Sequence, residues 1–279
     1  MPIRHKTREE KPVAGHKQTR NPEDLTEISL QERTTERMAR GFQILSCFRD
    51  GHEHLTNLDI SERTEIPKPT VSRMTASLLR LGYLAYDNTL GSYRLDFGLL
   101  ALARPLLIRD GFHSLLRPRM VALAEETGMT VAIGRRSGAQ MVYTDVIRSK
   151  APVTLALGVG SIVPLMSSAL GRAYLATLPP EQRADIVNET VEQQDMNLSE
   201  AEAIVKAAVD DYESVGYCVS IRELHPDVNA TAVAIIAPDD GSIVSIVCGA
   251  PASLLTVQLI REEIGPKLRT MAQELTFTS

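Results

Sequence analysis

The run 68–81 carries the side chains of this 279-residue chain whose types and spacing best suit chemistry. In a helix that turns about 100° per residue, one face of the run is apolar and the opposite face is polar. The apolar face holds Val71, Met74, Leu78 and Leu81, and the opposite face holds Pro69, Ser72, Arg73, Ala76 and Arg80. An arginine can bind a guanine edge with two hydrogen bonds, and short side chains let a helix approach bases closely. The pattern therefore indicates a helix that reads the major groove of DNA; the alternative is that its arginines are simply solvated.

The segments around this run are typical of a winged helix-turn-helix. A first helix carries Met38, Phe42, Leu45 and Phe48 on one stripe. Thr56 is a plausible N-cap for a second helix, Pro69 suits the first turn of the third, and Gly82 suits its end. Residues 83–95 read as two strands around a turn. We therefore predict a winged helix-turn-helix over residues 34–96.

The expected DNA contacts extend beyond the third helix. Lys68 and Thr70 lie at its start, where phosphate contacts are common. Ser92 and Arg94 lie on the wing and suit contact with the backbone or the minor groove. The predicted DNA-binding residues are Thr56, Asn57, Lys68, Pro69, Thr70, Ser72, Arg73, Arg80, Ser92 and Arg94.

The charge is distributed unevenly along the chain. Residues 1–94 hold 15 basic and 13 acidic side chains, a net of +2, whereas the rest holds 15 and 22, a net of −7. A basic front joined to an acidic rear suggests a nucleic-acid reader fused to a sensor or assembly domain, although two solvated surfaces can differ this much by chance. Residues 1–33 lack apolar periodicity and are predicted to be a flexible arm.

Residues 97–112 are predicted to form a linker helix whose leucines, such as Leu99, Leu102 and Leu106, are too many for a solvated surface. It packs either against a second copy in a dimer or within one subunit. Residues 113–279 mix β-rich runs with helices, which indicates an α+β domain around an antiparallel sheet. Helices are predicted over 115–127, 167–178 and 253–274 and after a Ser199–Glu202 capping box, and strands over 131–136, 141–147, 153–157, 231–237 and 242–249.

Several runs give the chain a resemblance to a known family. In the front half they are Ile66-Pro67-Lys68-Pro69-Thr70-Val71-Ser72-Arg73, Leu79-Arg80-Leu81-Gly82-Tyr83-Leu84 and Tyr93-Arg94-Leu95. In the rear half they include Leu123-Ala124-Glu125-Glu126-Thr127-Gly128, Ala169-Leu170-Gly171-Arg172-Ala173 and Gly216-Tyr217. In this order they resemble IclR-family transcriptional regulators over about residues 35–275. The resemblance implies a GAF-like rear domain that binds a small organic acid and assembles subunits.

A ligand site is expected where the loop 159–166 leads into a helix near Ser167 and Ser168. Small residues there let a carboxylate reach the free N–H groups and the positive end of the helix dipole. The alternative is a simple N-cap with no ligand. Matched segment by segment, the resemblance and the helix start give the effector-binding set Leu155, Val163, Ser167, Ser168, Ala169, Leu170, Ser220, Val228, Asn229, Ala230, Ile246 and Cys248. This set is more apolar than a site for glyoxylate or pyruvate, which suggests an aromatic acid.

Other classes of protein find little support in the sequence. The three cysteines lie far apart, which fits a reducing cytoplasm and neither a disulfide framework nor a metal site. No secretory signal or membrane span is visible. The sequence also shows no nucleophile elbow, P-loop or dinucleotide fingerprint, so we expect neither catalysis nor a cofactor. We predict a cytoplasmic, ligand-responsive regulator, such as a repressor, that binds a palindromic operator as a dimer or tetramer. The alternatives are an enzyme acting on a small organic acid, with a protein-interaction front domain, and a ligand-blind architectural DNA binder.

Overall fold

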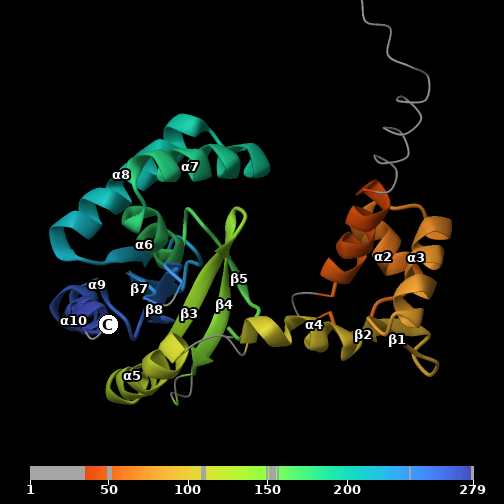
Figure 1. The fold of residues 1–279 in the computed structure, drawn as a ribbon, viewed down its shortest axis with the longest axis horizontal. Coiled ribbons are helices and arrows are strands. Elements are labelled where there is room, and N and C mark those ends of the chain that lie inside the picture. Colours follow the sequence, from red (N-terminus) through yellow and green to blue (C-terminus); the bar gives the residue numbers. More distant parts are fainter. Residues whose placement is uncertain are drawn as a thin grey trace, which may run out of the picture. The chain divides into compact units, whose positions relative to one another are not determined.

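The computed structural model describes residues 35–48, 52–107, 111–148, 150, 155, 157–238 and 240–277 (Figure 1). The predicted arm over 1–33 and residues 108–110 of the predicted linker helix lie outside this range. The chain divides into two compact units, Met1–Leu106 and Leu107–Ser279, which are described separately.

The first unit is a winged helix-turn-helix followed by one further helix. Its elements are a helix over 35–46, α2 (Asn57–Thr64), α3 (Lys68–Arg80), the antiparallel strands β1 (Leu84–Asp87) and β2 (Ser92–Leu95), and α4 (Gly98–Leu107). Ile44, Ile60, Val71 and Leu78 from the three helices meet in one core, which Leu55 and Leu84 complete. This packing holds α3 by its inner face and leaves its outer face in solvent.

Local sequence signals set the ends of these helices. Thr56 caps α2 in a reciprocal capping box with Asp59, as its residue type predicts. Gly82, with φ of +74°, turns the chain after α3 into β1. The predicted apolar face of this helix was wrong at Leu81, which is 64% exposed. It is the C-cap of α3, at the edge of that face, and does not pack on the other helices.

The second unit is built on a six-stranded antiparallel sheet in the order β5-β4-β3-β8-β7-β6, which with the first unit confirms the predicted α+β class. Its strands are β3 (Thr130–Ser137), β4 (Gln140–Ile147), β5 (Ile162–Pro164), β6 (Cys218–Ile221), β7 (Val228–Ile236) and β8 (Ile243–Pro251). Its helices are α5 (Gly111–Thr127), α6 (Ala169–Thr177), α7 (Pro180–Gln194), α8 (Leu198–Val215), α9 (Val257–Leu259), a π-helical turn (Ile260–Ile264) and α10 (Gly265–Phe277).

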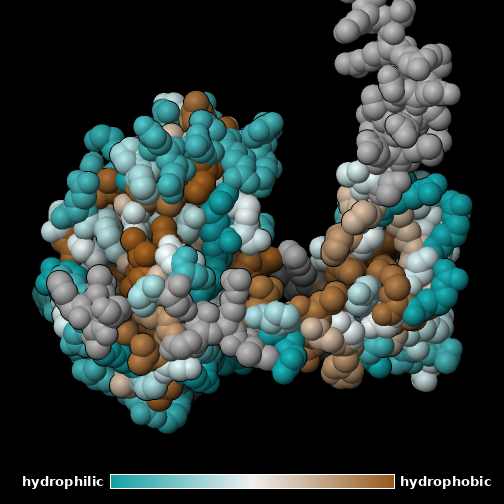
Figure 2. All heavy atoms as spheres, viewed as in Figure 1, coloured by the Kyte–Doolittle hydropathy of each residue, from teal (hydrophilic) through white to brown (hydrophobic). Residues whose placement is uncertain are grey.

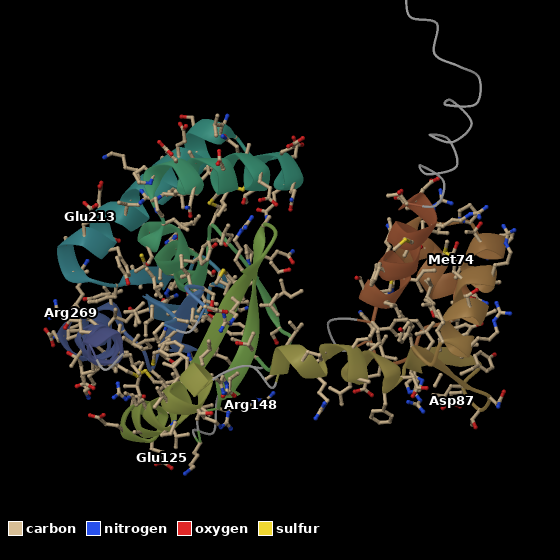
Figure 3. The ribbon with its side chains drawn as sticks, viewed as in Figure 1. Met74, Asp87, Glu125, Arg148, Glu213 and Arg269 are labelled. Atoms are coloured by element: carbon tan, nitrogen blue, oxygen red, sulfur yellow. The ribbon has the colours of Figure 1, made fainter. Side chains whose placement is uncertain are left out.

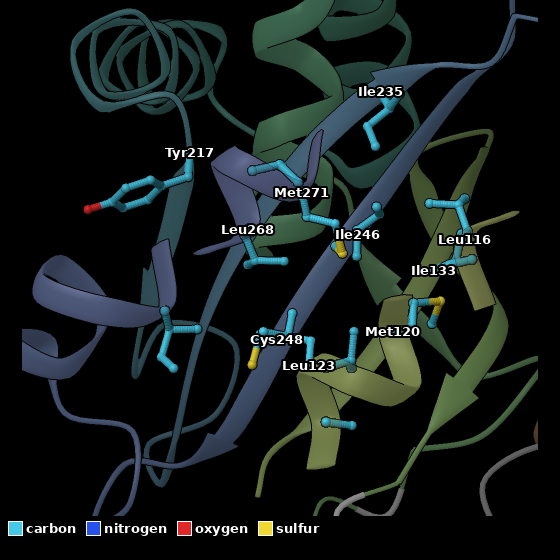
Figure 4. Close-up of a cluster of buried hydrophobic side chains, with 14 of the residues drawn as sticks. Leu116, Met120, Leu123, Ile133, Tyr217, Ile235, Ile246, Cys248, Leu268 and Met271 are labelled. Atoms are coloured by element: carbon cyan, nitrogen blue, oxygen red, sulfur yellow. The ribbon is translucent and has the colours of Figure 1, made fainter. Parts of the chain in front are cut away.

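Each face of the sheet packs on its own set of helices. Helices α5 and α10 cover one face through side chains such as Leu116, Met120 and Leu268 (Figure 4). Helix α6 covers the other face and α8 packs on α6, so that Leu170, Ala201 and Val205 share a second core with the alanines of β7. Because successive side chains of a strand point to opposite faces, the buried apolar residues of β7 and β8 are shared between the two cores.

Three local predictions in this unit need correction. Helix α8 begins at Leu198 and is capped by Asn197, whose side chain accepts from the N–H of Glu200, so Ser199 is not the cap. Helix α7 was not predicted, because Pro179 and Pro180 resemble a stop signal; Pro180 instead occupies the first turn of α7, where proline fits. Leu155 and Leu157 are not in a strand, and most of the predicted strand 153–157 lies outside the described residues.

Candidate functional site

The outer face of α3 presents a row of solvent-exposed residues. Val71, Thr75 and Leu78 are buried against the rest of the unit. Lys68, Pro69, Ser72, Arg73, Ala76 and Arg80 are exposed, and Thr70 is half-buried. The structure therefore places most of the predicted third-helix residues together on one accessible face.

The arginines of this face keep free donor groups. Arg73 Nε donates to the carbonyl of Pro69 at 3.3 Å, one turn earlier, and Arg80 donates to Ser77 Oγ at 3.3 Å. Among the described residues neither arginine has a carboxylate partner. A guanidinium has five N–H donors, so Arg73 retains a fork for an external acceptor.

Two predicted DNA-binding residues, Thr56 and Asn57, are engaged inside the domain. Thr56 Oγ1 donates to Asp59 at 2.7 Å within the capping box. The Asn57 amide donates to the Tyr93 hydroxyl and accepts from Thr75 Oγ1, both at 3.3 Å, which ties α2 to the wing and to α3. These contacts hold α3 in position within the domain.

Ser92 corrects the prediction for the wing. It is 3% exposed, and its hydroxyl lies 3.3 Å from His54 Nδ1, so it faces inward from the first position of β2. Arg94, two positions further along β2, is exposed. Arg94 is therefore the accessible wing residue of the predicted pair.

A groove beside α3 adds two arginines that the sequence interpretation missed. The cavity between α3 and the helix over 35–46 has a volume of about 610 Å³, and Met74 lies between the two helices (Figure 3). It is lined by Arg37, Arg40, Gly41, Thr70, Arg73, Met74, Ser77 and Leu78. Arg40 pairs with Glu36, whereas Arg37 has no carboxylate partner among the described residues. The i,i+3 spacing of Arg37 and Arg40, which places both on one side of a helix, was the available signal.

The candidate effector pocket lies between the start of α6 and the strands β6, β7 and β8. It is lined by Tyr143, Ser168, Ala169, Leu170, Ser220, Leu224, Val228, Ala230 and Val247. Six of these were predicted; Tyr143, Leu224 and Val247 were not. Its volume is about 10 Å³, at the lower limit for a single water molecule, so the pocket is closed.

Hydroxyl groups in and beside the pocket are already hydrogen-bonded. Ser168 caps α6: its Oγ accepts from the N–H of Gly171 at 3.1 Å and donates to the carbonyl of Pro164 at 2.6 Å. Ser220 Oγ donates to the carbonyl of Ser167 at 2.8 Å. The N–H groups of Ala169 and Leu170 belong to the first turn of α6, where no intrahelical acceptor exists. Burial raises the pKa of Tyr143 to about 12, so its phenol is neutral.

Ile246 and Cys248 correct the predicted pocket, because they face the opposite side of the sheet. Both pack in the core formed with α5 and α10, and Cys248 Sγ lies 3.8 Å from the sulfur of Met129 (Figure 4). Val247, between them on β8, lines the pocket instead. A shift of one residue along a strand exchanges the two faces, and matching segments by sequence does not fix that parity.

Four further predicted residues lie outside the lining: Leu155, Val163, Asn229 and Ser167, which is half-buried and whose carbonyl accepts from Ser220 Oγ. Asn229 is buried, donates to the carbonyl of Leu255 at 2.8 Å and accepts from the N–H of Arg222, so it has a structural role. Val163 is buried on β5. Leu155 is half-buried beside Gly249.

The buried cysteines and the potential metal ligands of the described part of the chain form no further site. Burial raises the pKa of both Cys218 and Cys248 to about 12, which keeps these thiols protonated. No group of three histidine, cysteine, aspartate or glutamate side chains there could hold a metal ion. None of the helices described is long and apolar enough to cross a membrane.

Comparison with known proteins gives matches along nearly the whole described chain. Residues 38–88 match the IclR helix-turn-helix domain, and residues 108–277 match the bacterial transcriptional regulator IclR C-terminal domain. The HTH-type transcriptional regulator TsaQ1/TsaQ2 of Comamonas testosteroni is 32% identical over 85% of this chain and 86% of its own.

Solved structures agree with these matches. An IclR family transcriptional regulator from Brucella abortus is 35% identical with a TM-score of 0.73, covering 88% of this chain and 92% of its own. An IclR homologue from Microbacterium hydrocarbonoxydans in complex with 4-hydroxybenzoate has the same fold, with 20% identity, a TM-score of 0.65 and coverage of 87% and 100%. The chain thus belongs to the IclR family of transcriptional regulators, with a helix-turn-helix DNA-binding domain and a C-terminal effector-binding domain.

Proposed function

We propose that this regulator acts in the cytoplasm, reads its operator with the outer face of α3, and responds to a small, aromatic organic acid. The observation that carries the proposal is the exposed face of α3, where Arg73 keeps a free fork beside the short side chains of Ser72 and Ala76. It acts by binding and not by catalysis, in keeping with relatives that are transcriptional regulators.

On the DNA side, each exposed residue receives a distinct role. Arg73 and Ser72 contact base edges in the major groove, because they lie at the centre of the outer face. Lys68 and Thr70 bind phosphates at the start of α3, and Arg37 and Arg40 bind phosphates from the adjoining groove. Pro69 and Arg80 flank these contacts on the same face, and Arg94 contacts the backbone from the wing.

On the effector side, the closed pocket favours a flat apolar acid. Most of its lining is aliphatic, with Tyr143 as an aromatic neighbour and Ser168 and Ser220 as polar ones. The ligand carboxylate binds the free N–H groups of Ala169 and Leu170 at the positive end of α6. The structural neighbour complexed with 4-hydroxybenzoate supports an aromatic acid as the first candidate.

The assembly is proposed to be a homodimer, or a tetramer of two dimers, joined through α4. Figure 2 shows apolar side chains at the surface along this helix. Phe97, Leu100, Leu102 and Leu106 are each more than half exposed. Leu100 lies on the side of α4 opposite Leu102 and Leu106, so apolar groups are exposed around the helix. They are costly to leave in water, and a second copy of α4 offers a matching surface.

The test of this function is binding of the purified chain to DNA taken from upstream of its own gene and of neighbouring genes. Fluorescence anisotropy is measured with and without a panel of aliphatic and aromatic acids. We expect one fragment to bind specifically, and at least one aromatic acid to change that affinity because it binds two arrangements of the protein unequally. Equal affinity for all fragments would contradict the proposal, and insensitivity to every acid would refute its effector half.

A further inference from the structure

The segment 222–227, between β6 and β7, covers the effector pocket. Leu224 from this segment lines the pocket, while the residues on either side of it are exposed. With a volume of about 10 Å³, the pocket cannot take an acid unless part of its lining moves. Strands and α6 are held by continuous hydrogen bonds, so the covering segment is the part best able to move.

One ion pair ties this segment to α6. Arg172 NH1 donates to Glu223 Oε1 at 2.8 Å, and its NH2 group donates to the other carboxylate oxygen. The paired geometry is the strong two-bond form that an arginine makes with any carboxylate. The Arg172 side chain is 13% exposed and that of Glu223 is 43% exposed. Of the two partners, the carboxylate is therefore the one that can leave.

The Arg172 guanidinium is not part of the pocket lining, but it bonds to the backbone of residues that adjoin the lining. A helical side chain points back toward the N-terminus of its helix, and Arg172 does so, since its Nε donates to the carbonyl of Met166 at 3.0 Å. Its NH1 also donates to the carbonyl of Val219 at 2.9 Å, one residue before the pocket residue Ser220. The pocket lining itself carries no charged side chain. These contacts leave a fixed cation beside an otherwise uncharged site.

We propose that the Glu223 carboxylate is an internal stand-in for the effector carboxylate, and that its ion pair with Arg172 is a latch that keeps the pocket closed. An acid ligand displaces Glu223 from Arg172, and loss of this ion pair releases Leu224 and opens the pocket. This inference rests on the proposed effector site and adds the residue that selects for an acid. One ligand oxygen binds the N–H groups of Ala169 and Leu170, and the other binds Arg172. No covalent bond changes, because one carboxylate simply replaces another.

Two properties of the segment support the exchange. Hydrogen bonding to Arg172 holds the pKa of Glu223 below its ordinary value, so the stand-in is an anion, as the ligand is. Arg222, at the start of the segment, has φ of +58°, a left-handed conformation that costs a non-glycine residue energy. The N–H of Arg222 donates to the Val228 carbonyl and to Asn229 Oδ1, so this end of the segment stays anchored when Glu223 is released.

The first arm of the test needs no ligand. Hydrogen exchange is measured at the backbone amides of 222–227 in the full chain, in Glu223→Gln and in Glu189→Gln. Glu189→Gln is a matched control, because Glu189 forms an ion pair with Arg136 in the same unit. The Glu189 side chain is 44% exposed and that of Arg136 is 21% exposed. We expect Glu223→Gln to speed exchange of the segment about 2- to 5-fold, the value of a partly exposed ion pair, and the control to leave it unchanged. Equal exchange rates of the 222–227 amides in Glu223→Gln and Glu189→Gln would show that the Arg172–Glu223 pair does not hold the segment.

The second arm compares 4-hydroxybenzoate with its neutral analogue 4-hydroxybenzamide by calorimetry. We expect the chain to prefer the acid, Glu223→Gln to bind the acid about 3- to 10-fold more tightly, and Arg172→Gln to lose the preference. Because Arg172→Gln also removes bonds to two carbonyls, Arg172→Lys serves as a second variant that should keep the preference for the acid.

Unchanged or weaker acid binding by Glu223→Gln would overturn the exchange. If neither probe binds any variant, the aromatic-acid class of the proposed function fails and the exchange step fails with it. The latch itself is then judged by hydrogen exchange alone.

Discussion

At the residue scale, the difference between reading and supporting side chains is one of free donors. Arg73 is exposed and makes a single local bond, so its fork remains available to a base. Both ends of the Asn57 amide are hydrogen-bonded, to Tyr93 and to Thr75, so we propose that Asn57 holds α3 in place and does not itself contact DNA. Residue type alone does not separate these roles, because asparagine and arginine are both common at base edges.

Replacing Arg73 with alanine should weaken operator binding by about 1–3 kcal/mol and relax the preference at one base pair, because a paired contact to a base edge is lost. Lys68→Ala should instead weaken binding to all sequences and reduce the salt dependence by about one phosphate contact. Anisotropy titrations on the operator and on single-base variants at several salt concentrations measure both. An equal loss on every sequence in Arg73→Ala would assign it to a phosphate.

The buried thiols should be inert in the folded chain. Burial raises the pKa of Cys218 and Cys248 to about 12, so almost no thiolate is present at pH 8. Brief treatment with a disulfide reagent, followed by mass mapping, should modify neither of them, and both should react once the chain is denatured. Partly exposed Cys47 is the internal comparison. Rapid labelling of Cys248 in the native state would show that its core opens.

At the element scale, periodicity and capping residues predicted much of the fold. The third helix, its Pro67-Lys68-Pro69 start and its Gly82 end follow from local rules. The face of the sheet to which each strand residue points does not follow from local rules. One step along β8 decides whether Cys248 or Val247 faces α6, and no local signal fixes that step. The Arg172–Glu223 ion pair does not follow from local rules either, because its two residues lie 51 positions apart and meet only after the sheet forms.

Two helical glycines should respond oppositely to alanine. A Cβ on Gly171 would lie 2.0 Å from the carbonyl oxygen of Leu165, a backbone clash at the start of α6, so Gly171→Ala should destabilise the second unit by about 2 kcal/mol or more. Gly41 has open space around it in the helix over 35–46, so Gly41→Ala should stabilise the first unit by about 0.5–1 kcal/mol. Thermal unfolding followed by circular dichroism measures both, and a neutral Gly171→Ala would contradict the packing at α6.

At the scale of the whole molecule, the exposed apolar side chains of α4 form the proposed interface between two copies of the chain. Leu102→Glu should convert the assembly to a smaller species, because it places a charge in the centre of the proposed interface. Leu198→Glu, at an exposed position on α8, is the matched control. Light scattering during gel filtration measures the mass. An unchanged mass in Leu102→Glu would place the assembly surface elsewhere.

The most direct test of the DNA-reading account is a cross-link from the outer face of α3. Ser72→Cys is mixed with operator DNA that carries a thiol tether on a major-groove base edge, and Ser214→Cys, an exposed position on α8, is the control. We predict that the cysteine at position 72 forms a disulfide with the tether at one position per half-site, and that the control forms none. Full operator binding without any cross-link from position 72 would contradict the account.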